Sequence, residues 1–248
     1  QAIRLKQSDS SNQTQAIILM PDPLPLDNVH NLRKYWKPTK ERLQRASSQH
    51  PLAVRMHRAF SWVASAEGDD PNEKLDEKLI FRWIGLNSLF GRWNSFDHEP
   101  ERDGRALTGF LTVIEECDKD SLIEACLTEQ QALVTQICSD PFVNKFFWKA
   151  LNTEKRFNRR RDQISIQRMY VNQNYRQILH EVFNRIYLVR CQLIHGAATF
   201  DSKLNREIVK QCGIVLESII FVTVRIIIDH AWSENWDDLC YPPVADAN

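Results

Sequence analysis

The most constraining feature of this sequence is a long, almost uninterrupted apolar run between Cys212 and Ile228. Its only charged residues are Glu217 and Arg225. The run is long enough to cross a bilayer, but two central charges are costly in lipid, which favours a helix buried in protein and no membrane span. A helix that is apolar on nearly all sides needs cover on more than one face. The run therefore predicts a core or interface helix over 202–231, and it favours a homodimer.

A second helix is expected just before this run, over 175–194. At about 100° per residue its apolar side chains form one broad stripe: Tyr175, Ile178, Leu179, Val182, Phe183, Ile186, Val189, Leu193 and Ile194. Arg190 falls inside the stripe, where an unpaired guanidinium is very costly, so it must reach a carboxylate, carbonyl groups or a water-filled cleft. Gly196 predicts the end of the helix and a turn that lets the imidazole of His195 fold back towards Arg190.

Strand signals are scarce elsewhere, so the fold class predicted is all-α, with the 175–194 and 202–231 helices packed antiparallel. Pro38 is expected to separate two short helices, and 164–174 show no clear period and are expected to be irregular. The other expected helices cover 28–37, 39–48, 52–66, 73–93, 105–117, 121–138 and 141–151.

Turn-forming residues at 68–72 suggest a boundary within the chain. We expect a disordered or extended tail, an N-terminal helical extension, a main helical domain and a loose C-terminal tail, over 1–27, 28–72, 73–236 and 237–248 respectively.

Composition excludes several classes of function. Lys plus Arg equals Asp plus Glu at 32 each, so any nucleic-acid binding must come from a local patch. The six cysteines show no C-x-x-C spacing, and phosphate-cradling glycine motifs are absent. We therefore expect no metal and no cofactor. The polar first twenty residues lack the pattern of a signal peptide, which makes a cytoplasmic protein the default.

The densest basic run, K-R-F-N-R-R-R, begins at Lys155. One interpretation is a solvated loop or helix end. The other is an RNA-binding patch, in which arginines bind phosphates and the interrupting residues allow stacking. The candidate RNA-binding residues are Arg156, Arg159, Arg160 and Arg161.

The pair Arg190 and His195 has the spacing R-x4-H, which resembles the R-x4-6-H signature of the HEPN superfamily of all-helical domains. Spacings of this kind also occur at Arg45/His50, Arg92/His98 and Arg225/His230. Only Arg190/His195 ends an amphipathic helix, is closed by glycine and precedes a long apolar helix. The segment F-R-W-I-G-L-N-S-L-F-G-R-W, from Phe81, also resembles the first core helix of the Apea-like HEPN subgroup. The resemblance covers 73–236.

The resemblance implies a metal-independent endoribonuclease, of the kind found among toxins and defence effectors, with Arg190 and His195 as catalytic residues. Histidine titrates near neutral pH and suits proton transfer, and arginine suits a phosphate. In this family the site is usually composite, with two motifs facing each other across a dimer, and an inhibitory protein partner is also implied.

Two alternatives remain open. Many family members carry Asn or Asp directly after the motif arginine, where this chain has Cys191, and this difference favours a catalytically silent module that binds RNA or a protein. The second alternative is purely structural. In it, Arg190 pairs with a carboxylate such as Glu217, and His195 satisfies carbonyl groups at the turn.

Overall fold

The computed structural model describes residues 26–47, 49–68, 70, 72–150, 158–234, 236 and 239–241. The predicted tails lie almost wholly outside these ranges. The elements are α1 (Val29–Ala46), α2 (Pro51–Ala66), α3 (Leu75–Phe90), β1 (Trp93–Asn94), β2 (Glu99–Pro100), α4 (Asp103–Cys117), α5 (Leu122–Glu129), α6 (Gln131–Ser139), the 3-10 turn η1 (Pro141–Val143), α7 (Lys145–Ala150), α8 (Arg159–Val171), α9 (Tyr175–Ile194) and α10 (Arg206–Asp229). The only sheet in the described residues is the β1–β2 hairpin, in which Trp93 pairs with Pro100. The all-α prediction is confirmed.

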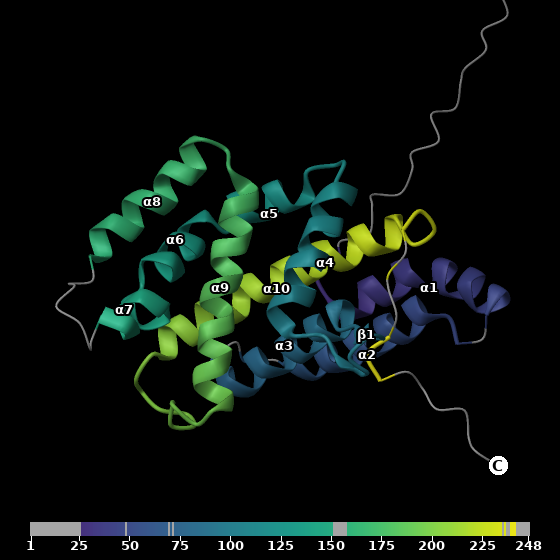
Figure 1. The fold of residues 1–248 in the computed structure, drawn as a ribbon, viewed down its shortest axis with the longest axis horizontal. Coiled ribbons are helices and arrows are strands. Elements are labelled where there is room, and N and C mark those ends of the chain that lie inside the picture. Colours follow the sequence, from purple (N-terminus) through teal and green to yellow (C-terminus); the bar gives the residue numbers. More distant parts are fainter. Residues whose placement is uncertain are drawn as a thin grey trace, which may run out of the picture.

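Helix α10 lies at the centre of the molecule (Figure 1), and other helices of the same chain pack around it. Its closest packing is against α3, and α1, α4, α5, α6 and α9 also contact it. By length and composition α10 could cross a membrane, but 72% of its most apolar window is buried inside the protein. The chain's own helices therefore cover most of the apolar surface that favoured a homodimer, and the homodimer stays a prediction that rests on the resemblance.

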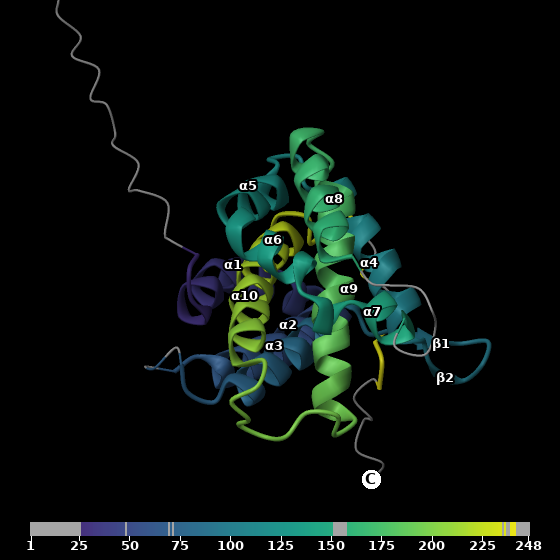
Figure 2. The same cartoon turned by 90° about the vertical axis from the view of Figure 1, so that its left-hand side faces the viewer.

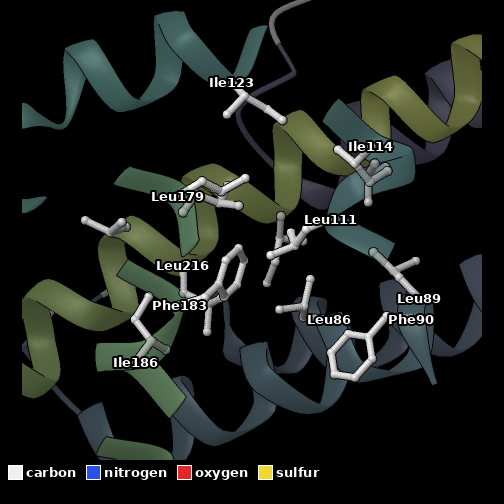
Figure 3. Packing of buried hydrophobic residues seen from close by; sticks show 14 of the residues in the cluster. Leu86, Leu89, Phe90, Leu111, Ile114, Ile123, Leu179, Phe183, Ile186 and Leu216 are labelled. Atoms are coloured by element: carbon white, nitrogen blue, oxygen red, sulfur yellow. The ribbon is translucent and has the colours of Figure 1, made fainter. Parts of the chain in front are cut away.

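Side chains from four long helices meet in the core (Figure 3). Leu216 of α10, Leu86 of α3, Phe183 of α9 and Leu111 of α4 are each at most 2% exposed and belong to one hydrophobic cluster. Figure 2 shows α9 and α10 running in opposite directions, and Figure 1 shows that α9 crosses α10 obliquely. The tertiary packing of α9 is thus spread over several partners and does not form one antiparallel pair.

The segment expected as an extension contributes to the same core, because Leu32 of α1 and Met56 of α2 belong to the same cluster as α10. Helices α2 and α3 form the most extensive helix pair. Gly85 of α3 permits this close approach, since a Cβ there would lie 2.5 Å from the Val63 side chain.

The expectations for Pro38 and for 164–174 were wrong. Pro38 lies inside one continuous helix, α1, rather than between two helices. Buried Trp36 and Leu43 hold the helix on both sides of the proline, and the exposed ring leaves the affected turn facing water. The segment expected to be irregular forms most of α8, which is anchored by only two buried residues, Ile166 and Tyr170. With only two buried residues, the apolar periodicity of this helix is weak in the sequence.

Pro38→Ala is expected to stabilise the protein, because the substitution restores a backbone donor and removes the ring from the interior of α1. The expected gain in the free energy of unfolding is up to about 3 kcal/mol. Urea denaturation of both proteins measures it. A loss of stability would contradict a continuous α1 across this position.

The predicted helix over 121–138 is two helices, α5 and α6, which meet at Gln130. The expected 141–151 helix is replaced by η1 and the short α7. Neither break is marked by glycine at the junction, so composition carried no signal for them. As a result of the first break, α5 and α6 each contact both α9 and α10, and after the second break η1 packs against α9.

Candidate functional site

The end of α9 is closed as the sequence predicts. His195 is the C-cap, and Gly196 follows with φ +68°, the left-handed conformation that glycine adopts readily. The Gly196 N–H donates to the Leu193 carbonyl at 3.2 Å, and the Ala197 N–H donates to the Gln192 carbonyl at 2.8 Å. These two bonds are the pair that defines a Schellman motif, so the turn is firmly built.

Arg190 is held by groups of α3, α4 and its own helix. Its Nη2 lies 3.5 Å from Oδ2 of Asp103, and its guanidinium carbon lies 5.8 Å from the ring centroid of Trp83 and 5.7 Å from that of Tyr187. The side chain is 22% exposed. The arginine in the apolar stripe thus has a carboxylate and two aromatic faces as partners, which is how a half-buried guanidinium is stabilised.

The structural alternative expected Arg190 to pair with a carboxylate such as Glu217; Arg190 does pair with a carboxylate, but the partner is Asp103 and not Glu217. Glu217 of α10 instead accepts from Arg82 of α3, with Nη2 at 2.5 Å and Nε at 3.2 Å from the same carboxylate oxygen. Gly213, one turn earlier on α10, makes room for this arginine, because a Cβ there would lie 3.1 Å from Arg82 Nη1. Helical periodicity places Glu217 and Arg190 near the core, but it does not tell whether Glu217 pairs with Arg190 or with Arg82.

His195 is exposed, and its imidazole makes no hydrogen bond or ion pair with any residue the structure describes. It lies five residues after Arg190, which is about 7.5 Å along the axis of a helix and about 140° around it. No contact joins the two side chains: Arg190 reaches towards α3 and α4, and His195 faces solvent. One chain therefore does not assemble the expected Arg/His pair.

Tyr187 is an ionisable group beside Arg190, in addition to Asp103 and Cys191. Burial, and then the neighbouring Cys191 thiol, raise the pKa of its hydroxyl above the ordinary value. The phenol therefore stays protonated at neutral pH and does not act as a base.

The basic run splits between described and undescribed residues. Arg156 lies outside the described residues, whereas Arg159, Arg160 and Arg161 form the first turn of α8. Asn158 caps this helix by accepting from the Arg161 N–H at 3.2 Å. All three arginine side chains are exposed, and none makes an ion pair or side-chain hydrogen bond with a residue in the described part of the chain.

A polar network that sequence reasoning missed positions this turn. Asn144, just before α7, donates to Asp162 in the first turn of α8. Arg185 of α9 is 7% exposed and lies 2.5 Å from Glu181 and 3.9 Å from Asp162. The only sequence signal was the i, i+4 spacing of Glu181 and Arg185, which is typical of many solvent-exposed pairs.

Helix α7 is docked at the C-terminal end of α9. The carbonyl of Phe142 accepts from Nε2 of Gln192 and from the indole N–H of Trp148, both at 2.8 Å. Gln192 lies less than one turn before His195. As a result, α7, the first turn of α8 and the end of α9 share one end of the molecule (Figures 1 and 2).

No family model, curated protein or solved structure matches this chain. Among the described residues, no group of three or more His, Cys, Asp or Glu side chains is arranged to hold a metal ion.

Proposed function

We propose that this protein binds single-stranded RNA at the end of the molecule formed by α7, the first turn of α8 and the end of α9. One observation carries the proposal: Arg159, Arg160 and Arg161 are adjacent, exposed and unpaired in the described structure. Arginine offers phosphate a planar, permanently charged fork, and three together supply the sequence-independent part of RNA affinity.

Their position in the helix strengthens this interpretation. The N-terminus of a helix carries partial positive charge, so cations in the first turn are unfavourable for the helix itself. Asp162 is the only acidic residue in that turn, and it is occupied by Asn144 and Arg185. A bound phosphate relieves this local repulsion. The phosphate also supplies negative charge at the N-terminus of α8, where a helix favours an anion.

Cleavage of the bound RNA is the second candidate function, and the exposed, unpartnered imidazole of His195 at the same end of the molecule favours it. In the reaction, the 2′-oxygen attacks phosphorus and the 5′-oxygen leaves, which gives a 2′,3′-cyclic phosphate. His195 would take the proton from the 2′-hydroxyl or give one to the leaving oxygen. Because Arg190 pairs with Asp103 and does not contact His195 in one chain, a composite site would require Arg190 of a second copy to leave Asp103 and bind the phosphate.

The binding proposal is tested by fluorescence anisotropy with a short, labelled single-stranded RNA in EDTA. We expect saturable binding whose affinity falls as salt rises. The absence of binding at low salt would contradict the proposal.

His195→Ala is expected to abolish formation of the 2′,3′-cyclic product while RNA affinity and the free energy of unfolding stay unchanged, because the side chain is exposed and makes no described contact. His98→Ala is the matched control, since His98 is exposed and belongs to another Arg/His spacing. Chromatography of the digest and denaturation measure the two effects. If the wild type binds RNA and never yields the cyclic product, the protein is a silent RNA-binding module.

A further inference from the structure

A small cavity of about 300 Å³ lies between α7, the end of α9 and the loop that leads to α10. Its lining is mainly apolar, with several amide and hydroxyl groups among its walls: Trp148, Leu188, Gln192, Ala197, Thr199 and Leu204 are the residues that matter for its chemistry. This volume is at the lower end of the range for small-molecule sites, which suits a single planar ring system.

One wall of the cavity is a fixed aromatic ring. The indole N–H of Trp148 donates to the Phe142 carbonyl at 2.8 Å, and the ring packs edge-on against Phe147 at a centroid distance of 5.3 Å. Trp148 is nonetheless 43% exposed. A tryptophan held by its indole N–H and by the rings of Phe142 and Phe147, and still partly exposed, offers apolar surface on which a planar ring can stack.

The wall beside Trp148 provides a hydrogen-bonding group of defined orientation. Gln192 uses its Nε2 to donate to the same Phe142 carbonyl at 2.8 Å. Its Oε1 accepts no hydrogen bond from the described residues. An amide acceptor fixed beside an aromatic ring can bond to the amino or imino edge of a base that lies against that ring.

The surroundings of the cavity are apolar close by and positive further out. Leu204 at its rim is 78% exposed and nearby Phe200 is 70% exposed, although water is a poor environment for both. Lys145 and Lys149 of α7 are exposed, and the three arginines of α8 lie beyond them. The exposed acidic residue of the loop, Asp201, is engaged with Arg206 at 3.5 Å.

We propose that this cavity binds one unstacked base of single-stranded RNA, stacked on Trp148 and hydrogen-bonded by Oε1 of Gln192. The inference rests on the proposed RNA binding and adds a base-dependent component to it. The positive rim favours a nucleic acid over an apolar protein segment, because a phosphate backbone that enters and leaves the cavity meets lysine and arginine on the way.

The experiment compares two oligomers of equal length and charge, a normal RNA and an abasic ribose-phosphate chain. The wild type is expected to bind the normal oligomer roughly 5- to 150-fold more tightly, which is the size of one base–aromatic stack. Trp148→Ala is expected to bind both oligomers equally and to keep the salt slope of the wild type. Trp62→Ala, a change to another exposed tryptophan that does not line the cavity, is the control.

Leu204→Glu provides a second variant with no risk to the fold, since the side chain is 78% exposed. The added negative charge weakens the binding of both oligomers by a similar factor, so the ratio of the two affinities reports only on the base. Because the carboxylate also replaces apolar surface at the rim of the cavity, we expect this ratio to fall towards one. If the wild type binds RNA but does not distinguish the two oligomers, or if Trp148→Ala leaves the ratio unchanged, the base pocket is disproved and the RNA-binding proposal stands. If no RNA binds at all, both proposals fail.

Discussion

Arg159→Ala, Arg160→Ala and Arg161→Ala combined are expected to weaken binding of single-stranded RNA on the order of 100-fold near 0.1 M salt. Each phosphate contact on a single strand contributes about 0.7 to the slope of log affinity against log salt, so the loss of three contacts lowers the slope by about 2. The effect is uniform across sequences, because phosphate contacts do not read bases. Anisotropy titrations at several salt concentrations measure both quantities.

The same variant is not expected to lose stability. The three side chains make no described contact, and removal of positive charge from the N-terminal turn of α8 favours the helix. Lys34→Ala, Lys37→Ala and Arg45→Ala combined remove three exposed cations from α1, which lies at the opposite end of the molecule (Figure 1). An equal loss of affinity in this control would show that the whole surface, and not α8, attracts RNA.

Glu217→Met is expected to destabilise the protein far more than the removal of an exposed charge does. Arg82 is 11% exposed and Glu217 is 26% exposed, and they join α3 to the central helix α10. Removal of the carboxylate leaves a guanidinium buried without its partner, and the free energy of unfolding should fall by about 3 kcal/mol. Urea denaturation at neutral pH measures the loss.

The double variant Arg82→Met/Glu217→Met separates this cause from simple loss of packing. With both charges gone, the aliphatic side chains can pack together, so most of the lost stability should return. Arg105→Met is the control: that arginine is 72% exposed and pairs with Glu101 at 3.7 Å, so its removal should change stability by no more than about 1 kcal/mol. A double variant as unstable as Glu217→Met alone would show that the unpaired Arg82 guanidinium is not the cause of the lost stability.

The sequence predicted best where periodicity and a terminator agreed. The bounds Tyr175–Ile194 and the turn at Gly196 match the structure, because a broad apolar stripe and a glycine in the left-handed region both mark that helix. The central place of α10 followed from the same reasoning. Pro38 misled because tertiary packing of the residues on either side of it overrides the local penalty of a proline.

The partners within the candidate site could not be predicted from periodicity. Arg190 and Arg82 both occupy half-buried positions near carboxylates, and only the tertiary arrangement gives Asp103 to one and Glu217 to the other. The docking of α7 onto α9 depends on one carbonyl, that of Phe142, which has no sequence signature. The basic run was visible in the sequence. Its position in the first turn of a helix, close to the contact between α7 and α9, was not.

Photo-crosslinking of bound RNA tests the central claim most directly. RNA that carries a photoreactive thiouridine is irradiated with the wild-type protein in EDTA, and the crosslinked peptides are identified by mass spectrometry. We expect the crosslinks to fall on α7, on the first turn of α8 and in the 195–205 segment that follows α9. Crosslinks confined to helices α1 to α4, or the absence of any crosslink at a salt concentration low enough for binding, would contradict the location and the function proposed for this end of the molecule.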